Sequence, residues 1–240
     1  MSGKRLRKAV YHHSDSCRLS VDLTKLEEKY CHAVSRLIDE VLKELKQGGW
    51  IRKEEDFATL ASAQLQLIIG RINAHADVAN ALTLAFFTKP HRFSRSLENL
   101  HVGFTNENVP SVWFYDLFNI FVESMELTRQ TLLLMIADKK PFRHGMTLGQ
   151  VVREIAKACP MSGKTFASEI SVELRNALAH GNYWLTKEGT EWILHYTETL
   201  GHTAKSEPLL QVAIRMRRDN LLGTTLTENL ARKMKSGWFK

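Results

Sequence analysis

The chain has 240 residues, 44% of them hydrophobic and 25% charged, and its 33 Lys and Arg against 26 Asp and Glu give a net charge of +7. No apolar run approaches the roughly 20 residues of a membrane span, and the basic start lacks the apolar core of a secretory signal. We therefore expect a soluble, cytoplasmic protein with reduced cysteines, whose positive charge favours a polyanionic partner.

The first part of the chain predicts two long helices. Between residues 23 and 46 apolar side chains recur at spacings of three and four, which is the pattern of one amphipathic helix face. Residues 54–87 continue with an apolar helical pattern until Pro90, which cannot continue a helix. We expect helices over 23–46 and 54–87, preceded by a basic N-terminal segment over residues 1–20.

The middle of the chain predicts a loop followed by two helices. Residues 89–110 are rich in polar and turn-forming residues, so a long loop is expected there. Residues 111–138 are strongly apolar and predict a central helix. Thr147 and Gln150 have the spacing of a capping box, which predicts the start of a short helix that ends before Pro160.

The next helix contains the stretch VELRNALAHGNYW, residues 172–184. The pattern predicts one continuous helix over residues 164–180. Gly181 follows it and is suited to the left-handed conformation that commonly ends a helix. These helices together predict a helical bundle over residues 21–182.

After the bundle, the hydrophobic period changes from that of helices to that of strands. Two aromatic and β-branched runs within 183–198 flank a Gly-containing turn and predict a hairpin. Alternation over 209–217 predicts a third strand, and Thr225 and Glu228 predict a capping box that starts a terminal helix. We expect a mainly α fold in which a three-stranded antiparallel β-meander and a C-terminal helix, residues 183–240, pack on the same domain.

Two patterns that suggest ligand sites lack the necessary context. The SGKT sequence at 162–165 is similar to the end of a phosphate-binding P-loop, but Ala158 stands where that motif needs glycine. A helix, rather than a strand, is also predicted before it, so a helix-starting turn is expected. The histidines and cysteines among the first 32 residues match no zinc spacing. No metal or cofactor is therefore expected.

A polar stripe runs along the predicted central helix. Asp116, Asn119, Glu123 and Glu126 recur at spacings of three and four, which places them on one face. Such a stripe is most often solvated. Aligned carboxylates can also bind a metal or pair with an arginine across a cleft, so Glu123 and Asp116 are kept as further candidates.

Arg175, Asn176 and His180 lie at the end of the helix that contains the VELRNALAHGNYW stretch. Phosphodiester cleavage without a metal needs a group that moves a proton near neutral pH and a group that stabilises charge on the phosphoryl oxygens. Histidine and arginine have these abilities. The alternative is structural: Arg175 pairs with Glu173 or another acid, and His180 caps the helix.

The sequence RNALAHGNY, between a helical bundle and a small β element, resembles the signature of the HEPN superfamily: Arg, four to six residues, then His, commonly with a polar residue after the Arg. HEPN proteins are helical bundles, and many are metal-independent endoribonucleases of toxin, antiphage or RNA-processing systems whose active site forms where two subunits meet. The resemblance implies that Arg175 and His180 are catalytic and that Asn176 orients them. Related toxins often carry a tyrosine two residues after the histidine, and Tyr183 lies three residues after His180.

The leading functional prediction is an endoribonuclease that cleaves RNA by attack of a 2′-hydroxyl, with a homodimer and an antitoxin or regulatory protein as possible partners. The basic residues Arg215, Arg217 and Arg218 are candidates for contact with RNA. The competing prediction is a non-catalytic HEPN-like module that binds a nucleotide or protein, because a fold is inherited more widely than an activity. A DNA-binding regulator has only the basic charge in its favour.

Overall fold

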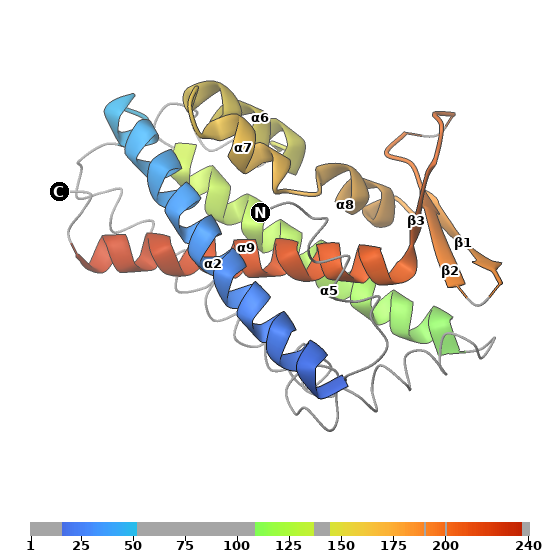
Figure 1. The fold of residues 1–240 in the computed structure, drawn as a ribbon. Helices are drawn as coiled ribbons and strands as arrows, with labels where there is room; N and C mark the ends of the chain where they lie inside the picture. Colours follow the sequence, from blue (N-terminus) through green and yellow to red (C-terminus); the bar gives the residue numbers. More distant parts are fainter. Residues whose placement is uncertain (1–15, 52–108, 137–144, 190, 200, 237–240) are drawn as a thin grey trace. The chain divides into compact units, whose positions relative to one another are not determined.

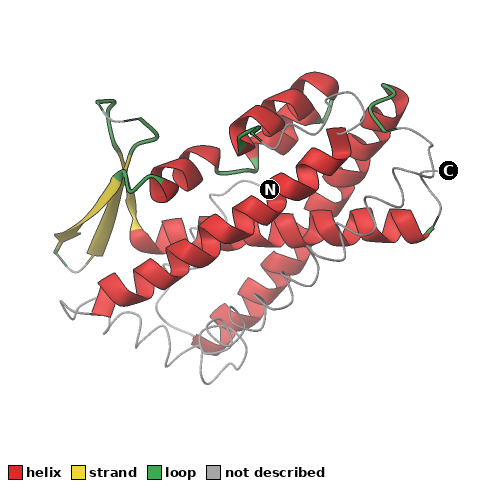
Figure 2. Cartoon of the chain, turned by 180° about the vertical axis from the view of Figure 1, so that it is seen from behind, coloured by secondary structure: helices red, strands yellow, loops and turns green. Residues whose placement is uncertain are grey.

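A computed structural model of the chain describes residues 16–51, 109–136, 145–189, 191–199 and 201–236 (Figure 1). The helices are α2 (Ser16–Gln47), α5 (Val109–Ile136), α6 (Leu148–Ala158), α7 (Gly163–Ser168), α8 (Val172–Ala179) and α9 (Leu209–Lys235). The strands are β1 (Tyr183–Glu188), β2 (Glu191–Tyr196) and β3 (Lys205–Pro208). Figure 2 shows that helix predominates and that the strands form one small sheet, as predicted. The predicted helix over 54–87 and nearly all of the predicted loop over 89–110 lie outside the described residues.

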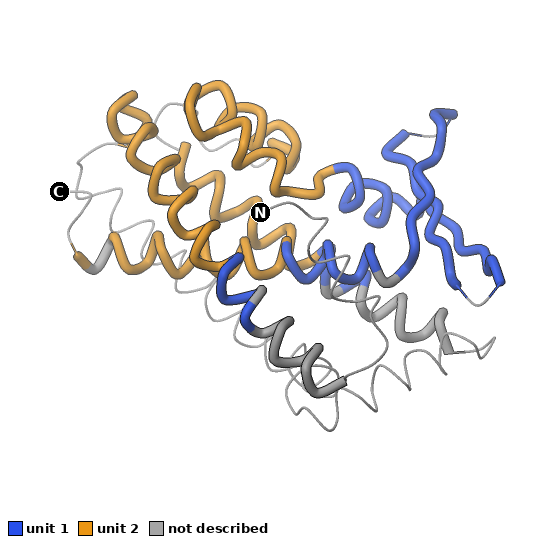
Figure 3. Tube along the Cα trace, viewed as in Figure 1, with its two compact units in different colours: residues 1–30, 74–122, 173–218 blue, residues 31–73, 123–172, 219–240 orange. Residues whose placement is uncertain are grey.

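The chain divides into two compact units, each built from separate segments (Figure 3). Unit 1 comprises residues 1–30, 74–122 and 173–218, and unit 2 comprises residues 31–73, 123–172 and 219–240. The three long helices α2, α5 and α9 each contribute residues to both units, whereas the sheet belongs to unit 1 and helices α6 and α7 belong to unit 2. Each unit therefore combines segments that are far apart in the sequence.

The core of unit 2 includes the apolar stripe predicted for the first helix. The buried α2 side chains in this unit are Val34, Ile38, Val41, Leu42 and Leu45. Helices α5 and α9 approach closely in the same unit, where the hydroxyl oxygens of Thr131 and Thr227 lie 3.3 Å apart. Both hydroxyls also bond a carbonyl one turn earlier in their own helix, so their burial leaves no polar group unsatisfied.

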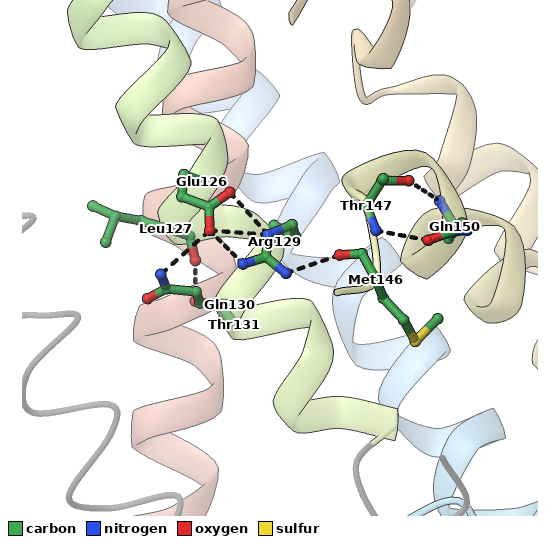
Figure 4. Close-up of polar contacts among 8 residues, drawn as sticks. All are labelled: Glu126, Leu127, Arg129, Gln130, Thr131, Met146, Thr147 and Gln150. Atoms are coloured by element: carbon green, nitrogen blue, oxygen red, sulfur yellow. Dashed lines mark hydrogen bonds and ion pairs between the residues drawn. The ribbon is translucent and has the colours of Figure 1, made fainter. Parts of the chain in front are cut away.

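The start of α6 follows the prediction. Thr147 accepts a hydrogen bond from the Gln150 backbone N–H, and the Gln150 side chain accepts one from the Thr147 N–H, which completes the capping box. Figure 4 shows the anchor beside this cap: Arg129 of α5 binds Glu126 of its own helix and donates from Nη1 to the Met146 carbonyl, 2.8 Å away. Arg129 thereby fixes the residue before the cap to α5.

The SGKT sequence forms the predicted helix-starting turn, because α7 begins at Gly163. The carboxylate of Glu44 accepts hydrogen bonds from the backbone N–H groups of Met161 and Ser162, at 3.1 and 2.9 Å, and from the Ser162 hydroxyl. Burial alone would raise the pKa of Glu44, but these three bonds outweigh it and lower the pKa. A side chain at Gly163 would lie 2.8 Å from both the Ile155 carbonyl oxygen and the Ala156 Cα, so close packing on α6 explains the glycine.

The prediction of one helix over 164–180 is wrong, because the chain forms α7 and α8 with a break over residues 169–171. At the break Ile170 is buried, and the Ser171 N–H donates to Oδ1 of the buried Asp219 at 3.1 Å. The carboxylate of Asp219 thus replaces the helical acceptor that the Ser171 N–H would otherwise need. The hydrophobic periodicity of residues 164–180 could not predict this break, because the partner lies 48 residues away in the sequence.

The sheet is the predicted antiparallel meander, with strand order β1-β2-β3. In the hairpin, Glu188 pairs with Glu191 around Gly189, which has a φ of 62°. The third strand, however, is Lys205–Pro208, and the predicted strand over 209–217 is wrong because those residues begin α9.

The predicted capping box at Thr225 and Glu228 is also wrong, because both residues lie inside α9. The buried positions Leu209, Val212 and Met216 explain the difference. Their spacings of three and four define a helix face just as the alternation defines a strand face. The α9 helix directly follows Pro208, whose fixed φ suits a helix entry.

Candidate catalytic site at the end of helix α8

Helix α8 ends in a two-bond cap whose centre is His180. The Asn182 N–H donates to the Ala177 carbonyl at 2.8 Å and the Gly181 N–H donates to the Leu178 carbonyl at 3.2 Å. Gly181 adopts the predicted left-handed conformation, with a φ of 70°. This arrangement is a Schellman motif with His180 as the C-cap residue. The sequence therefore fixes the place at which the chain leaves the helix and turns toward β1.

The buried side of α8 holds the helix in place, and the polar residues of this segment differ in exposure. Leu174, Ala177 and Leu178 are buried, as the sequence predicts. Arg175 is half-buried and the His180 side chain is exposed. Within the described part of the chain, the His180 imidazole has no hydrogen-bond partner.

Asn176 links Arg175 to an acidic residue that the sequence analysis missed. Nη1 of Arg175 donates to Oδ1 of Asn176 at 3.1 Å, and Nδ2 of Asn176 donates to Oε1 of Glu198 at 2.7 Å. The Asn176 amide therefore uses its acceptor toward the cation and its donor toward the carboxylate. We call this chain of three residues the Arg175–Asn176–Glu198 relay.

The predicted hairpin contains the signal that could have found Glu198. An antiparallel hairpin returns the chain to its starting point, so the residues after its second strand lie beside the residues before its first. The Thr197 N–H indeed donates to the Asn182 carbonyl at 3.1 Å. Glu198, the next residue, is thereby brought to the end of α8.

An ion pair holds the sheet to this helix. Lys205 at the start of β3 pairs with Glu173 in the first turn of α8. The structural interpretation of Arg175 suggested that it pairs with Glu173 or another acid, whereas Glu173 pairs with Lys205. Both side chains are substantially exposed, so the pair contributes little to stability. Its effect is to position β3 next to α8.

The arrangement at the end of α8 can perform acid–base chemistry next to a bound phosphate. An exposed imidazole can reach a proton of the substrate, and a guanidinium oriented by an amide can donate hydrogen bonds to phosphoryl oxygens. A phosphate that approaches the Asn176 amide group would meet the carboxylate of Glu198, which already accepts a hydrogen bond from Nδ2. The site therefore offers both a proton carrier and an anion-binding group.

The further candidates from the sequence lie on other elements. Tyr183, the first residue of β1, packs edge-on against Phe118 of α5, with ring centroids 5.0 Å apart and an interplanar angle of 87°. Glu123 is an exposed residue of α5, and Asp116 also lies on α5. Glu126, from the same polar stripe, binds Arg129 of its own helix. The stripe is therefore only partly solvated.

The three arginines proposed for RNA contact make intramolecular contacts on α9. Arg215 pairs with Glu207, and Arg217 pairs with Glu27 through Nε at 3.1 Å. The Arg218 guanidinium lies 4.8 Å from the ring centroid of Tyr30. These contacts help to hold α9 to β3 and α2 and leave less of the positive charge available to a polyanion.

Arg215 completes a polar network that joins β2, β3 and α9. The Tyr196 hydroxyl donates to Oε1 of Glu207 at 2.6 Å and accepts from Nη1 of Arg215 at 2.9 Å. Burial, followed by the hydrogen bond to Glu207, raises the pKa of Tyr196 to about 12. Burial would raise the pKa of Glu207 as well, but the bonds from Arg215 and Tyr196 lower it. The network explains how the polar strand β3 is held without apolar alternation.

The described residues contain no group of three or more His, Cys, Asp or Glu side chains that could hold a metal ion. Of the helices in the described ranges, none is long and apolar enough to cross a membrane.

Comparisons with protein-family models, curated proteins and solved structures find no match to this chain. The resemblance to HEPN proteins therefore depends on Arg175, Asn176 and His180 and on their place at a helix end. The function has to be argued from the site itself.

Proposed function

We propose that the chain is a metal-independent endoribonuclease of the HEPN type. One observation carries the proposal: His180 is exposed at the C-cap of α8, and five residues earlier Arg175 is bonded to Asn176. The net charge of +7 is consistent with a polyanionic substrate. The proposal includes a cytoplasmic setting, with a toxin or antiphage system as the biological context.

In the proposed reaction, the 2′-oxygen of a ribose forms a bond to the adjacent phosphorus while the bond from phosphorus to the 5′-oxygen breaks. His180 takes the 2′-hydroxyl proton or supplies a proton to the leaving oxygen. Arg175 stabilises the negative charge of the phosphorane, and Asn176 orients Arg175. The products are a 2′,3′-cyclic phosphate and a 5′-hydroxyl.

The proposal also includes a two-fold homodimer. One Arg and one His are few groups for a reaction that needs both an acid and a base. A two-fold contact at the end of α8 would bring a second Arg and a second His into the same cleft. Light scattering at micromolar concentration should therefore give twice the mass of the chain, and a monomer at that concentration would contradict this part of the proposal.

The test is cleavage of single-stranded RNA in excess chelator, with product ends identified by mass spectrometry. His180→Ala and Arg175→Ala should each reduce cleavage by roughly a hundredfold or more, and Asn176→Ala should act more mildly. His32→Ala, which removes an exposed histidine on α2, is the matched control and should leave the rate unchanged. DNA of the same sequence should not be cleaved, because it lacks the nucleophile.

The alternative is a non-catalytic HEPN-like module that binds a nucleotide or protein. It is favoured by the half-buried position of Arg175 and by the bond between Asn176 and Glu198, which both limit access of a phosphate to the site. Cleavage that disappears in chelator, or that persists undiminished in both the His180 and the Arg175 variants, would contradict the proposed mechanism and favour this alternative.

A further inference from the structure

One face of the sheet carries an aromatic stack that the proposed reaction does not use. Trp184 of β1 pairs across the strands with His195 of β2, and their rings are stacked, with centroids 5.0 Å apart and an interplanar angle of 11°. The two ring nitrogens of His195 lie 2.6 Å from the Thr186 hydroxyl and 2.8 Å from the Ser206 hydroxyl. All three strands therefore contribute to fixing the imidazole on which Trp184 rests.

The Trp184 side chain does not belong to the core. It is 50% exposed, and among the described residues only Met161 is another exposed large hydrophobic side chain. The opposite face of the sheet carries Tyr183, packed on Phe118, and the buried Tyr196. Burial of apolar surface thus explains the aromatic residues on that opposite face. It does not explain why an exposed tryptophan is stacked on a histidine.

The stack forms a preorganised planar surface. An exposed tryptophan normally loses rotamer freedom when it binds a ligand. Here the His195 ring, held from both sides by hydroxyl groups, already restrains the indole through stacking on one of its faces. A second planar group that stacks on Trp184 would meet a side chain whose orientation is largely set. Nucleobases are planar, and unpaired bases stack on aromatic side chains in proteins that bind single strands.

The position of the stack relates it to the candidate catalytic site. Trp184 follows His180 by four residues, so an extended chain separates their Cα atoms by at most about 14 Å. At the other end of the same sheet face, Glu188 pairs directly with Glu191 at the hairpin turn. Two carboxylates there disfavour the phosphates of a nucleic acid.

We propose that Trp184, stacked on His195, is a binding site for one unpaired nucleobase of single-stranded RNA. The inference rests on the proposed function, under which this base flanks the phosphate that the site of Arg175 and His180 would cleave. The site selects for an unpaired base, because a base inside a duplex has no free face to offer. It tolerates different bases, since every base has a π face.

The test measures binding separately from cleavage. A fluorescein-labelled 12-nucleotide RNA with 2′-O-methyl groups throughout cannot undergo 2′-hydroxyl attack, and its binding is measured by anisotropy at one fixed salt concentration. Trp184→Ala should weaken binding roughly 5- to 150-fold, the range for loss of one stacked base, whereas Trp184→Phe should retain most of it. Met161→Ala removes the other exposed large hydrophobic side chain of the described residues and should have no effect. Circular dichroism and thermal unfolding check that each variant is folded.

A second arm tests whether the base itself is bound. A 2′-O-methyl RNA of the same length with abasic nucleotides throughout should bind the parent protein more weakly than the intact RNA does, and this difference should be much smaller for Trp184→Ala. Duplex RNA should compete poorly. Equal binding of parent protein and Trp184→Ala, or a change in self-association in place of RNA binding, would overturn the inference and indicate a protein-contact surface. The outcome is independent of the cleavage assay, because the RNA used here cannot be cleaved.

Discussion

The contact between α5 and α9 in unit 2 leaves no room for a side chain at position 223. A Cβ built on Gly223 would lie 2.3 Å from Oγ1 of Thr128, far inside van der Waals contact. Thr128 is only 2% exposed, and its hydroxyl donates to the Ser124 carbonyl at 3.0 Å. Gly223→Ala must therefore displace a buried, hydrogen-bonded side chain or move the two helices apart.

Two opposing effects determine the stability of Gly223→Ala. Alanine is a better helix former than glycine by about 1 kcal/mol. Inserting a methyl group into a packed contact costs about 1 to 3 kcal/mol, and losing the Thr128 hydrogen bond costs about 1 kcal/mol more. The contact outweighs the helix propensity, so the free energy of unfolding should fall by about 1 to 3 kcal/mol.

Urea unfolding at 25 °C measures this change, and Thr128→Ala provides the decisive background. Removing the Thr128 hydroxyl removes the atom at 2.3 Å, and the next atom, the Thr128 Cβ, lies at an ordinary 3.6 Å. In this background Gly223→Ala should stabilise the protein by up to about 1 kcal/mol. An equal loss of stability in both backgrounds, or a gain in the parent protein, would refute the reasoning.

Three further predictions concern the polar groups. Glu44→Gln should lower the free energy of unfolding by about 1 kcal/mol at pH 7. The hydrogen bonds of Glu44 lower its pKa from the ordinary 4.5 in spite of burial. The stability difference should therefore be constant above about pH 4.5 and disappear as the pH falls through the folded-state pKa, which unfolding measured from pH 7 to 3 would show. Cys159 should be alkylated by iodoacetamide at pH 8 far more slowly than Cys31, because burial and then the Glu44 charge raise the pKa of its thiol to about 12; equal rates by mass spectrometry would contradict this. Glu207→Gln should cost about 1 to 2 kcal/mol in urea unfolding through loss of its ion pair with Arg215, and an unchanged midpoint would contradict that.

The parts of the fold that depend on local sequence could be predicted. The capping box of Thr147 and Gln150 and the helix end at Gly181 involve only neighbouring residues, and both are confirmed. The break between α7 and α8 depends on Asp219, and the residues over 209–217 carry a pattern that fits a helix face as well as a strand. At the break a tertiary partner decided the outcome, and over 209–217 the pattern fits two structures, so periodicity alone could settle neither case.

The candidate site divides in the same way. Arg175 and His180 could be predicted because a single helix and its cap place them. Glu198 could not be predicted from spacing, since it reaches Asn176 only through the register of the hairpin and the bond between Thr197 and Asn182. The Trp184 stack likewise depends on pairing between β1 and β2. Strand register, rather than composition, assembled the features that were missed.

The Arg175–Asn176–Glu198 relay bears on how a phosphate would bind under the proposed mechanism. Arg175 is half-buried, and a nearby carboxylate offsets part of the cost of removing its charge from water. A phosphodiester carries a single negative charge, as Glu198 does, so exchanging one for the other at the Asn176 amide changes the electrostatic energy little. The phosphorane carries more negative charge than either group. The same donors would therefore bind the transition state more strongly than the ground state, which is the condition for lowering the barrier. Under the proposed mechanism, Glu198 would thus oppose binding of the substrate phosphate more than binding of the transition state, although the sequence motif does not include it.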